Sequence, residues 1–133
     1  MNDTKNDPLN QLFVSESQAI NRQELAELLL PYTAIHKETK EITFTSQFLE
    51  LKNNSKILIL LAAIKARSLI LPDIDDKISP LEIIKMEIIP EGSVKTSLKS
   101  LLDLKEIKSE KGRYYLPNYK IPQVVNNFKK IKQ

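Results

Sequence analysis

The sequence predicts a mainly helical protein with a small β component. An apolar run from Ile57 to Ile64 covers more than one face of a helix, which is typical of a central, buried helix. Apolar residues recur at helical spacing from Val94 to Leu102, and two pairs of short alternating segments favour β-hairpins. With 133 residues, 41% of them hydrophobic and 28% charged, the chain has the composition of one compact globular domain, with room for a terminal extension.

The net charge of +3 is unevenly distributed along the chain. Residues 1–76 contain 8 Lys/Arg and 11 Asp/Glu, whereas residues 77–133 contain 12 Lys/Arg and 6 Asp/Glu. The second half is therefore a candidate surface for a polyanion such as nucleic acid. A lysine-rich surface that only keeps the protein soluble is the alternative.

Composition argues against several classes of protein. The chain has no cysteine, so it has neither a disulfide nor a thiolate metal site. The segment Met1–Leu12 lacks the basic and apolar regions of a secretory signal, and Ile57–Ile64 is too short to cross a bilayer. We expect a cytoplasmic protein without membrane association, located at the nucleoid if the source is prokaryotic.

The first third of the chain is predicted to form a flexible N-terminal segment followed by an extension to the core domain. Residues 1–14 are polar, and we expect them to be flexible. Residues 15–51 follow as an extension, in which either Ser15 with Gln18 or Asn21 with Glu24 could open a helix that stops before Pro31. A hairpin is expected from Tyr32 to Thr45, with Ile42 and Phe44 on one strand face, and then a short helical turn at Phe48, Leu49 and Leu51.

Residues 52–117 are predicted to form the core of the domain. Asn54 or Ser55 caps the central helix, which runs from Lys56 to about Leu69. The segment Pro72–Asp76 carries three acids but lacks the glycine and the distant glutamate of a calcium loop, so we interpret it as a solvated loop.

A second helix is predicted from Ser79-Pro80-Leu81-Glu82. This stretch supplies a hydroxyl N-cap, a proline at the first helical position and a glutamate three residues after the cap. Leu81, Ile84 and Ile88 lie at helical spacing, and the helix must end by Ile89 because Pro90 follows.

A third helix follows a turn at Pro90-Glu91-Gly92-Ser93, with Ser93 as its expected cap. Val94, Leu98, Leu101 and Leu102 form one apolar stripe. The opposite face shows side chains that can donate to phosphates and base edges, namely Lys95, Thr96, Lys99 and Ser100. A solvated helix face is the alternative interpretation.

A basic hairpin is predicted between Ile107 and Leu116. Gly112 lies near its tip, where a glycine can adopt the positive φ of a tight turn, and the other glycine, Gly92, falls at the preceding bend. One of the two tyrosines in this hairpin is expected in the core and the other on the surface. Its cations are Lys108, Lys111 and Arg113, and its tyrosines are Tyr114 and Tyr115.

The stretch Ser79 to Leu116 resembles the winged helix-turn-helix superfamily of DNA-binding proteins. The resemblance lies in a short helix, a tight turn, a helix ending in a leucine pair, and a basic hairpin closing with GRYYL. It implies a winged helix with an added N-terminal helix and hairpin, in which the helix at residues 93–103 enters the major groove of double-stranded DNA and the wing at 107–116 contacts the backbone. The implied contacts are Ser93, near a phosphate, with Lys95, Thr96, Lys99 and Ser100 in the groove and Lys108, Lys111 and Arg113 on the wing.

One departure from that family concerns base reading. The predicted groove face lacks arginine, asparagine and glutamine, the residues that contact guanine or adenine with two hydrogen bonds. We therefore expect modest sequence specificity, or recognition partly through DNA shape.

The resemblance implies a transcriptional regulator or a replication or partition factor. The alternative is a winged-helix adaptor, a subunit of a larger complex that makes no direct DNA contact. No catalytic constellation is visible, and the single histidine, His36, lies in a polar hairpin, so we expect no enzyme, cofactor or metal.

The tail at 118–133 predicts a helix with Val124, Val125, Phe128 and Ile131 on one face. This helix could pack on the first helix, could form a homodimer together with the other terminal helix, or could follow DNA phosphates.

Overall fold

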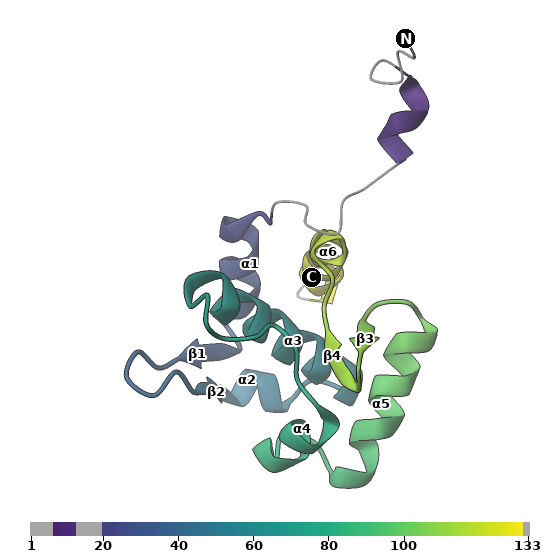
Figure 1. Ribbon diagram of the computed structural model, residues 1–133. Helices are drawn as coiled ribbons and strands as arrows, with labels where there is room; N and C mark the ends of the chain where they lie inside the picture. The colour runs from purple at the N-terminus through teal and green to yellow at the C-terminus, as the bar shows by residue number, and fades with distance from the viewer. Residues whose placement is uncertain (1–6, 13–19, 132–133) are drawn as a thin grey trace.

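The computed structural model describes residues 7–12 and 20–131 (Figure 1). The chain is mainly helical with two small antiparallel hairpins, as the sequence predicts at this level. A short 3-10 helix, η2 (Pro8–Leu12), stands apart from the body and buries no residue. The other elements are α1 (Arg22–Leu29), β1 (Thr33–Ile35), β2 (Ile42–Phe44), α2 (Ser46–Leu49), α3 (Asn53–Ile70), α4 (Pro80–Met86), α5 (Glu91–Asp103), β3 (Lys108–Glu110), β4 (Arg113–Tyr115), η3 (Asn118–Lys120) and α6 (Ile121–Ile131).

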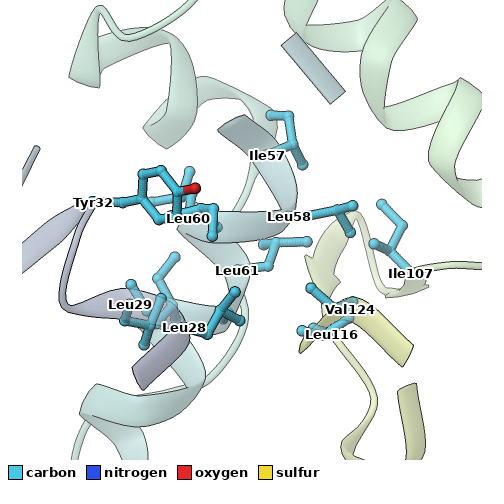
Figure 2. Packing of buried hydrophobic residues seen from close by; sticks show 14 of the residues in the cluster. Leu28, Leu29, Tyr32, Ile57, Leu58, Leu60, Leu61, Ile107, Leu116 and Val124 are labelled. Carbon is cyan, nitrogen blue, oxygen red and sulfur yellow. The ribbon is translucent and has the colours of Figure 1, made fainter. Parts of the chain in front are cut away.

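Helix α3 is the centre of the molecule. Its residues 57–65 are all buried, which confirms the prediction of a buried central helix. Figure 2 shows its side chains between two groups, Leu28, Leu29 and Tyr32 on one side and Ile107, Leu116 and Val124 on the other. The predicted cap is wrong, because the helix begins at Asn53 and its N-cap Lys52 makes no side-chain cap bond.

The N-terminal extension follows its prediction where the structure describes it. Asn21 caps α1 and accepts a hydrogen bond from the Glu24 amide at 3.1 Å, while the alternative start at Ser15 and Gln18 lies outside the described residues. In the β1–β2 hairpin, Ile42 is buried and Phe44 half-buried on the same face, and the Phe44 ring stacks on Phe48 of α2.

Helix α4 starts as predicted but turns a different face to the core. Ser79 and Glu82 form the capping box around Pro80. The helix already ends at Met86, because Glu87 adopts a left-handed conformation with φ 57°. Ile88 therefore lies beyond the helix, and its spacing from Leu81 does not show which helix face is buried. The residue that faces the core is Ile83, which is fully buried, whereas Leu81 is 60% exposed.

The turn between α4 and α5 differs from its prediction. Helix α5 begins at Glu91, directly after its N-cap Pro90, and Ser93 is the third residue of the helix instead of its cap. Gly92, which we expected in the turn, lies inside the first turn of the helix without a positive φ, and the left-handed residue between the two helices is Glu87.

The C-terminal hairpin is present, and Ile78 extends it. Lys111 and Gly112 have φ of 52° and 78°, the two consecutive positive values of a type I′ turn. Ile78 forms an antiparallel bridge to Tyr114 with hydrogen bonds of 3.0 and 2.8 Å. The expected division of the tyrosines is wrong, since Tyr114 and Tyr115 are both half-buried.

Helix α6 packs on the first helix, which is one of the three roles that the sequence left open. Val124, Val125 and Phe128 are buried, and the Phe128 ring meets Tyr32 edge to face at 5.9 Å between centroids. The side chain of Ile131 lies outside the described ones. None of the helices in the described part of the chain has the length and hydropathy needed to span a membrane.

Candidate nucleic-acid interface

The exposed face of α5 carries three of the predicted contact residues. Val94, Leu98 and Leu101 are buried and the helix packs on α3 and α4, which turns Lys95, Thr96 and Lys99 outward. Among the residues that the structure describes, no acid lies within ion-pair distance of either lysine. Both ammonium groups are thus available to an external anion.

The two serines of the predicted set are placed differently. Ser100 is half-buried, and its hydroxyl accepts a hydrogen bond from the Asn54 side chain of α3 at 3.2 Å. The Ser93 amide already donates to the Pro90 carbonyl at 2.9 Å, and Glu91 adds a negative charge to the same helix end. The Ser93 amide is therefore not free for the expected phosphate contact, and the carboxylate of Glu91 partly offsets the positive end of the helix dipole.

The three hairpin cations divide into one free and two engaged side chains. Lys111 is exposed at the turn. The Lys108 ammonium lies 5.2 Å from the centre of the Tyr119 ring. Arg113 contacts Glu82 at 3.1 Å and Asp75 at 3.5 Å, and it donates to the Lys77 carbonyl at 2.7 Å. Arg113 thus attaches the hairpin to the start of α4, and its charge is largely neutralised within the protein.

The contact with Arg113 changes the pKa of Glu82, the capping carboxylate of α4. Burial alone would raise the pKa of Glu82, but hydrogen bonds from Ser79 and the charge of Arg113 hold it below its ordinary value. Glu82 therefore stays ionised near neutral pH and serves both the helix cap and the hairpin.

The sequence analysis did not predict a cluster of ion pairs that lies between α3, the loop before α4 and strand β4. Lys65 is buried in α3 and pairs with Asp76, which also contacts Lys77 at 3.2 Å. Tyr115 lies beside this cluster, with the Lys77 ammonium 5.0 Å from its ring centre. The loop at 72–76 is solvated at Pro72, Asp73 and Asp75, as predicted, whereas Asp76 is half-buried in this cluster. A lysine at the end of a buried apolar run was the available signal, since such a group needs a carboxylate partner.

Two further exposed lysines flank α5 and were not predicted as contacts. Lys85 lies in the last turn of α4, and Lys105 follows the end of α5 with φ 60°. Their positions at the C-terminal ends of the two predicted helices, next to the predicted contact helix, were the signal that could have identified them.

The other candidate chemistry is sparse. His36 is exposed and shares a hydrogen bond of 3.0 Å with Thr43, in line with its predicted surface position. Within the described ranges, no three His, Cys, Asp or Glu side chains are grouped as metal ligands. Comparisons with protein families, curated proteins and solved structures found no match to this chain.

Proposed function

We propose that residues 52–117 form a winged helix-turn-helix and that the protein binds double-stranded DNA through the exposed face of α5. The observation that carries the proposal is the pair Lys95 and Lys99, which are held outward by a buried stripe and have no internal acid partner. Lysines on one side of a helix can reach phosphates on both edges of a major groove about 12 Å wide.

The order of elements supports the winged-helix part of the proposal. Helix α3, the bridge at Ile78, helices α4 and α5, and strands β3 and β4 follow one another along the chain. The single-residue bridge at Ile78 pairs with the other edge of β4, so the segment before the helix pair is joined to the hairpin that follows it. Lys111 at the exposed turn is the cation of this hairpin that could reach DNA.

Arg113 has a different role in this proposal from the one that the resemblance implies. Its contacts with Glu82 and Asp75 hold the hairpin against α4, so it positions the wing instead of contacting DNA. The contact set therefore centres on Lys95, Thr96 and Lys99, with Lys85, Lys105 and Lys111 at its margins.

Binding of a random-sequence duplex as a function of salt tests the proposal. We expect log Kd to rise linearly with log salt, by about 0.9 per neutralised phosphate. The variant Lys95→Ala/Lys99→Ala should fold normally, bind about tenfold or more weakly, and show a slope smaller by about 2.

The matched control is Lys129→Ala/Lys130→Ala, which removes the same charge from the exposed side of α6. We expect it to change affinity by less than about threefold, because these charges lie away from α5 and are screened over about 10 Å. Equal losses in both variants would contradict the placement on α5. An absence of binding at low salt would reject DNA binding and favour the adaptor.

A further inference from the structure

An apolar face lies on the side of the molecule away from α5. Leu30 at the end of α1, Ile35 of β1 and Ile70 of α3 are 73%, 38% and 70% exposed. Figure 1 shows β1 and the end of α3 at the left of the molecule and α5 at the right. We call this surface the α1–β1–α3 face. Other exposed leucines, such as Leu81 and Leu104, sit singly on other elements, which is normal for a protein surface.

Two hollows shape this face, and Ile35 forms a wall of both. One, of about 230 Å³, is lined by Ala26, Leu29, Leu30, Thr33, Ala34, Ile35 and Ala66. The other, of about 340 Å³, is bordered by three cationic side chains, Lys37, Lys40 and Arg67, and by no acid. The Nε of Arg67 is buried and finds no acceptor among the described residues. The face thus combines apolar hollows with a margin of three cationic side chains, which form no ion pair with the described acids, although Glu38 and Glu41 lie in the same β1–β2 turn.

The chain contains a segment with complementary properties. In η2, Leu9 and Leu12 are 62% and 77% exposed. Residues three apart in a 3-10 helix lie in line, about 6 Å from each other along the axis, so the two leucines form one apolar edge. Asp7 precedes them, and residues 1–19 contain three acids and one lysine. A five-residue helix of this kind is not stable by itself in water and needs a surface to pack on.

We propose that η2 of one copy of the chain docks on the α1–β1–α3 face of a second copy, with Leu9 and Leu12 in the two hollows and Asp7 near the cationic margin. Within its own copy η2 lies apart from the body and leaves both leucines exposed (Figure 1). The eight residues 13–20 can span up to about 29 Å, which suffices to reach a neighbouring molecule. Reciprocal exchange gives a closed two-fold dimer in which both copies of α5 remain exposed.

Sedimentation equilibrium of the full chain tests the dimer. We expect a concentration-dependent dimer that Leu9→Ser/Leu12→Ser and Ile70→Lys each weaken at least tenfold, whereas Leu104→Ser changes it less than twofold. All these positions are exposed, so folding should persist, as checked by circular dichroism. A protein that stays monomeric, or a dimer that neither variant weakens, would overturn the proposal.

Disulfide trapping tests the geometry, because the chain has no cysteine of its own. Leu9→Cys and a size-tagged Ile70→Cys, mixed and mildly oxidised, should form a mixed dimer several times faster than Leu9→Cys with a tagged Leu104→Cys, because Asp7 at the cationic margin places Leu9 in the hollow that Ile70 lines. The double variant Leu9→Cys/Ile70→Cys should give interchain products. A bond only within one chain would place η2 on its own body and refute the exchange, as would equal rates in the two mixtures. DNA binding does not enter either readout, so this proposal can fail independently of the proposed function.

Discussion

The two glycines occupy backbone positions with opposite requirements. Gly112 has φ 78° in the β3–β4 turn, a conformation that L side chains rarely adopt, although a Cβ there would meet no atom within 4 Å. Gly92 lies in the first turn of α5 with an ordinary helical φ, and a Cβ there would also meet nothing within 4 Å. Backbone conformation alone therefore separates the two sites.

Alanine at each glycine should shift stability in opposite directions. Gly112→Ala is expected to cost about 1–2 kcal/mol of unfolding free energy because of left-handed strain. Gly92→Ala should add about 0.5 kcal/mol, because alanine restricts the unfolded chain and favours the helix. Urea unfolding of both variants provides the measurement. A loss of stability for Gly92→Ala would mean that its backbone differs from the helical one described.

At the scale of the elements, Lys65 and Asp76 join the loop before α4 to the central helix. Lys65 is buried, and Asp76 is half-buried. Burial alone would raise the pKa of Asp76, but hydrogen bonds and charges from Lys65 and Lys77 hold it below its ordinary value. The ionised form of Asp76 is thus favoured by folding, and its contribution is present above the unfolded pKa and lost as the pH falls through the folded one.

Asp76→Asn should therefore destabilise the protein in a pH-dependent way. We expect a loss of about 2 kcal/mol at pH 7, because a buried ammonium loses its charged partner. The difference from wild type should shrink as the pH falls below the ordinary aspartate pKa of 3.8, and it should be lost only below the lower pKa of folded Asp76. Urea unfolding at pH 7 and pH 3 measures both values. Asp73→Asn, in the exposed part of the same loop, is the control and should change stability by less than about 0.5 kcal/mol.

Local sequence signals predicted where the helices and hairpins lie better than which of their residues are buried. The caps at Asn21 and Ser79, the stripe from Val94 to Leu101 and the hairpin around Gly112 each depend on neighbouring residues, and each is confirmed. Leu102, the last residue of the predicted stripe, is only half-buried. The end of α4 was not predictable, since a left-handed glutamate at position 87 has no sequence signature. Helix α4 contains apolar residues at both Leu81 and Ile83, so the elements that pack against the helix decide which of the two is buried.

The candidate site shows the same division between local and long-range signals. Helical period predicted that Lys95, Thr96 and Lys99 face outward. The positions of Ser100 and Arg113 depend on contacts with Asn54, Glu82 and Asp75, which lie 31 to 46 residues away in sequence. Basic residues within a predicted wing could therefore not be divided into free and engaged ones before the fold was known.

At the scale of the whole molecule, one core connects all the main elements. Its buried residues run from Leu25 to Phe128 and include side chains from α1, α3, α5 and α6. Leu60 and Leu61 of α3 are fully buried with Leu28, Leu29 and Tyr32 on one side of them (Figure 2). The helices outside residues 52–117 thus cover the apolar surface of the central helix.

This shared core predicts that residues 52–117 do not fold independently. Without α1 and α6, α3 would expose leucines on a fragment of a size at which burial is already marginal. We expect this fragment to show no cooperative urea transition. At a protein concentration where the full chain is monomeric, residues 20–131 should retain its unfolding free energy within about 1 kcal/mol, because η2 buries no residue within its own copy. Circular dichroism during urea titration distinguishes the two fragments. A cooperative transition for residues 52–117 would show that this segment is stable by itself and that α1 and α6 are accessory to it.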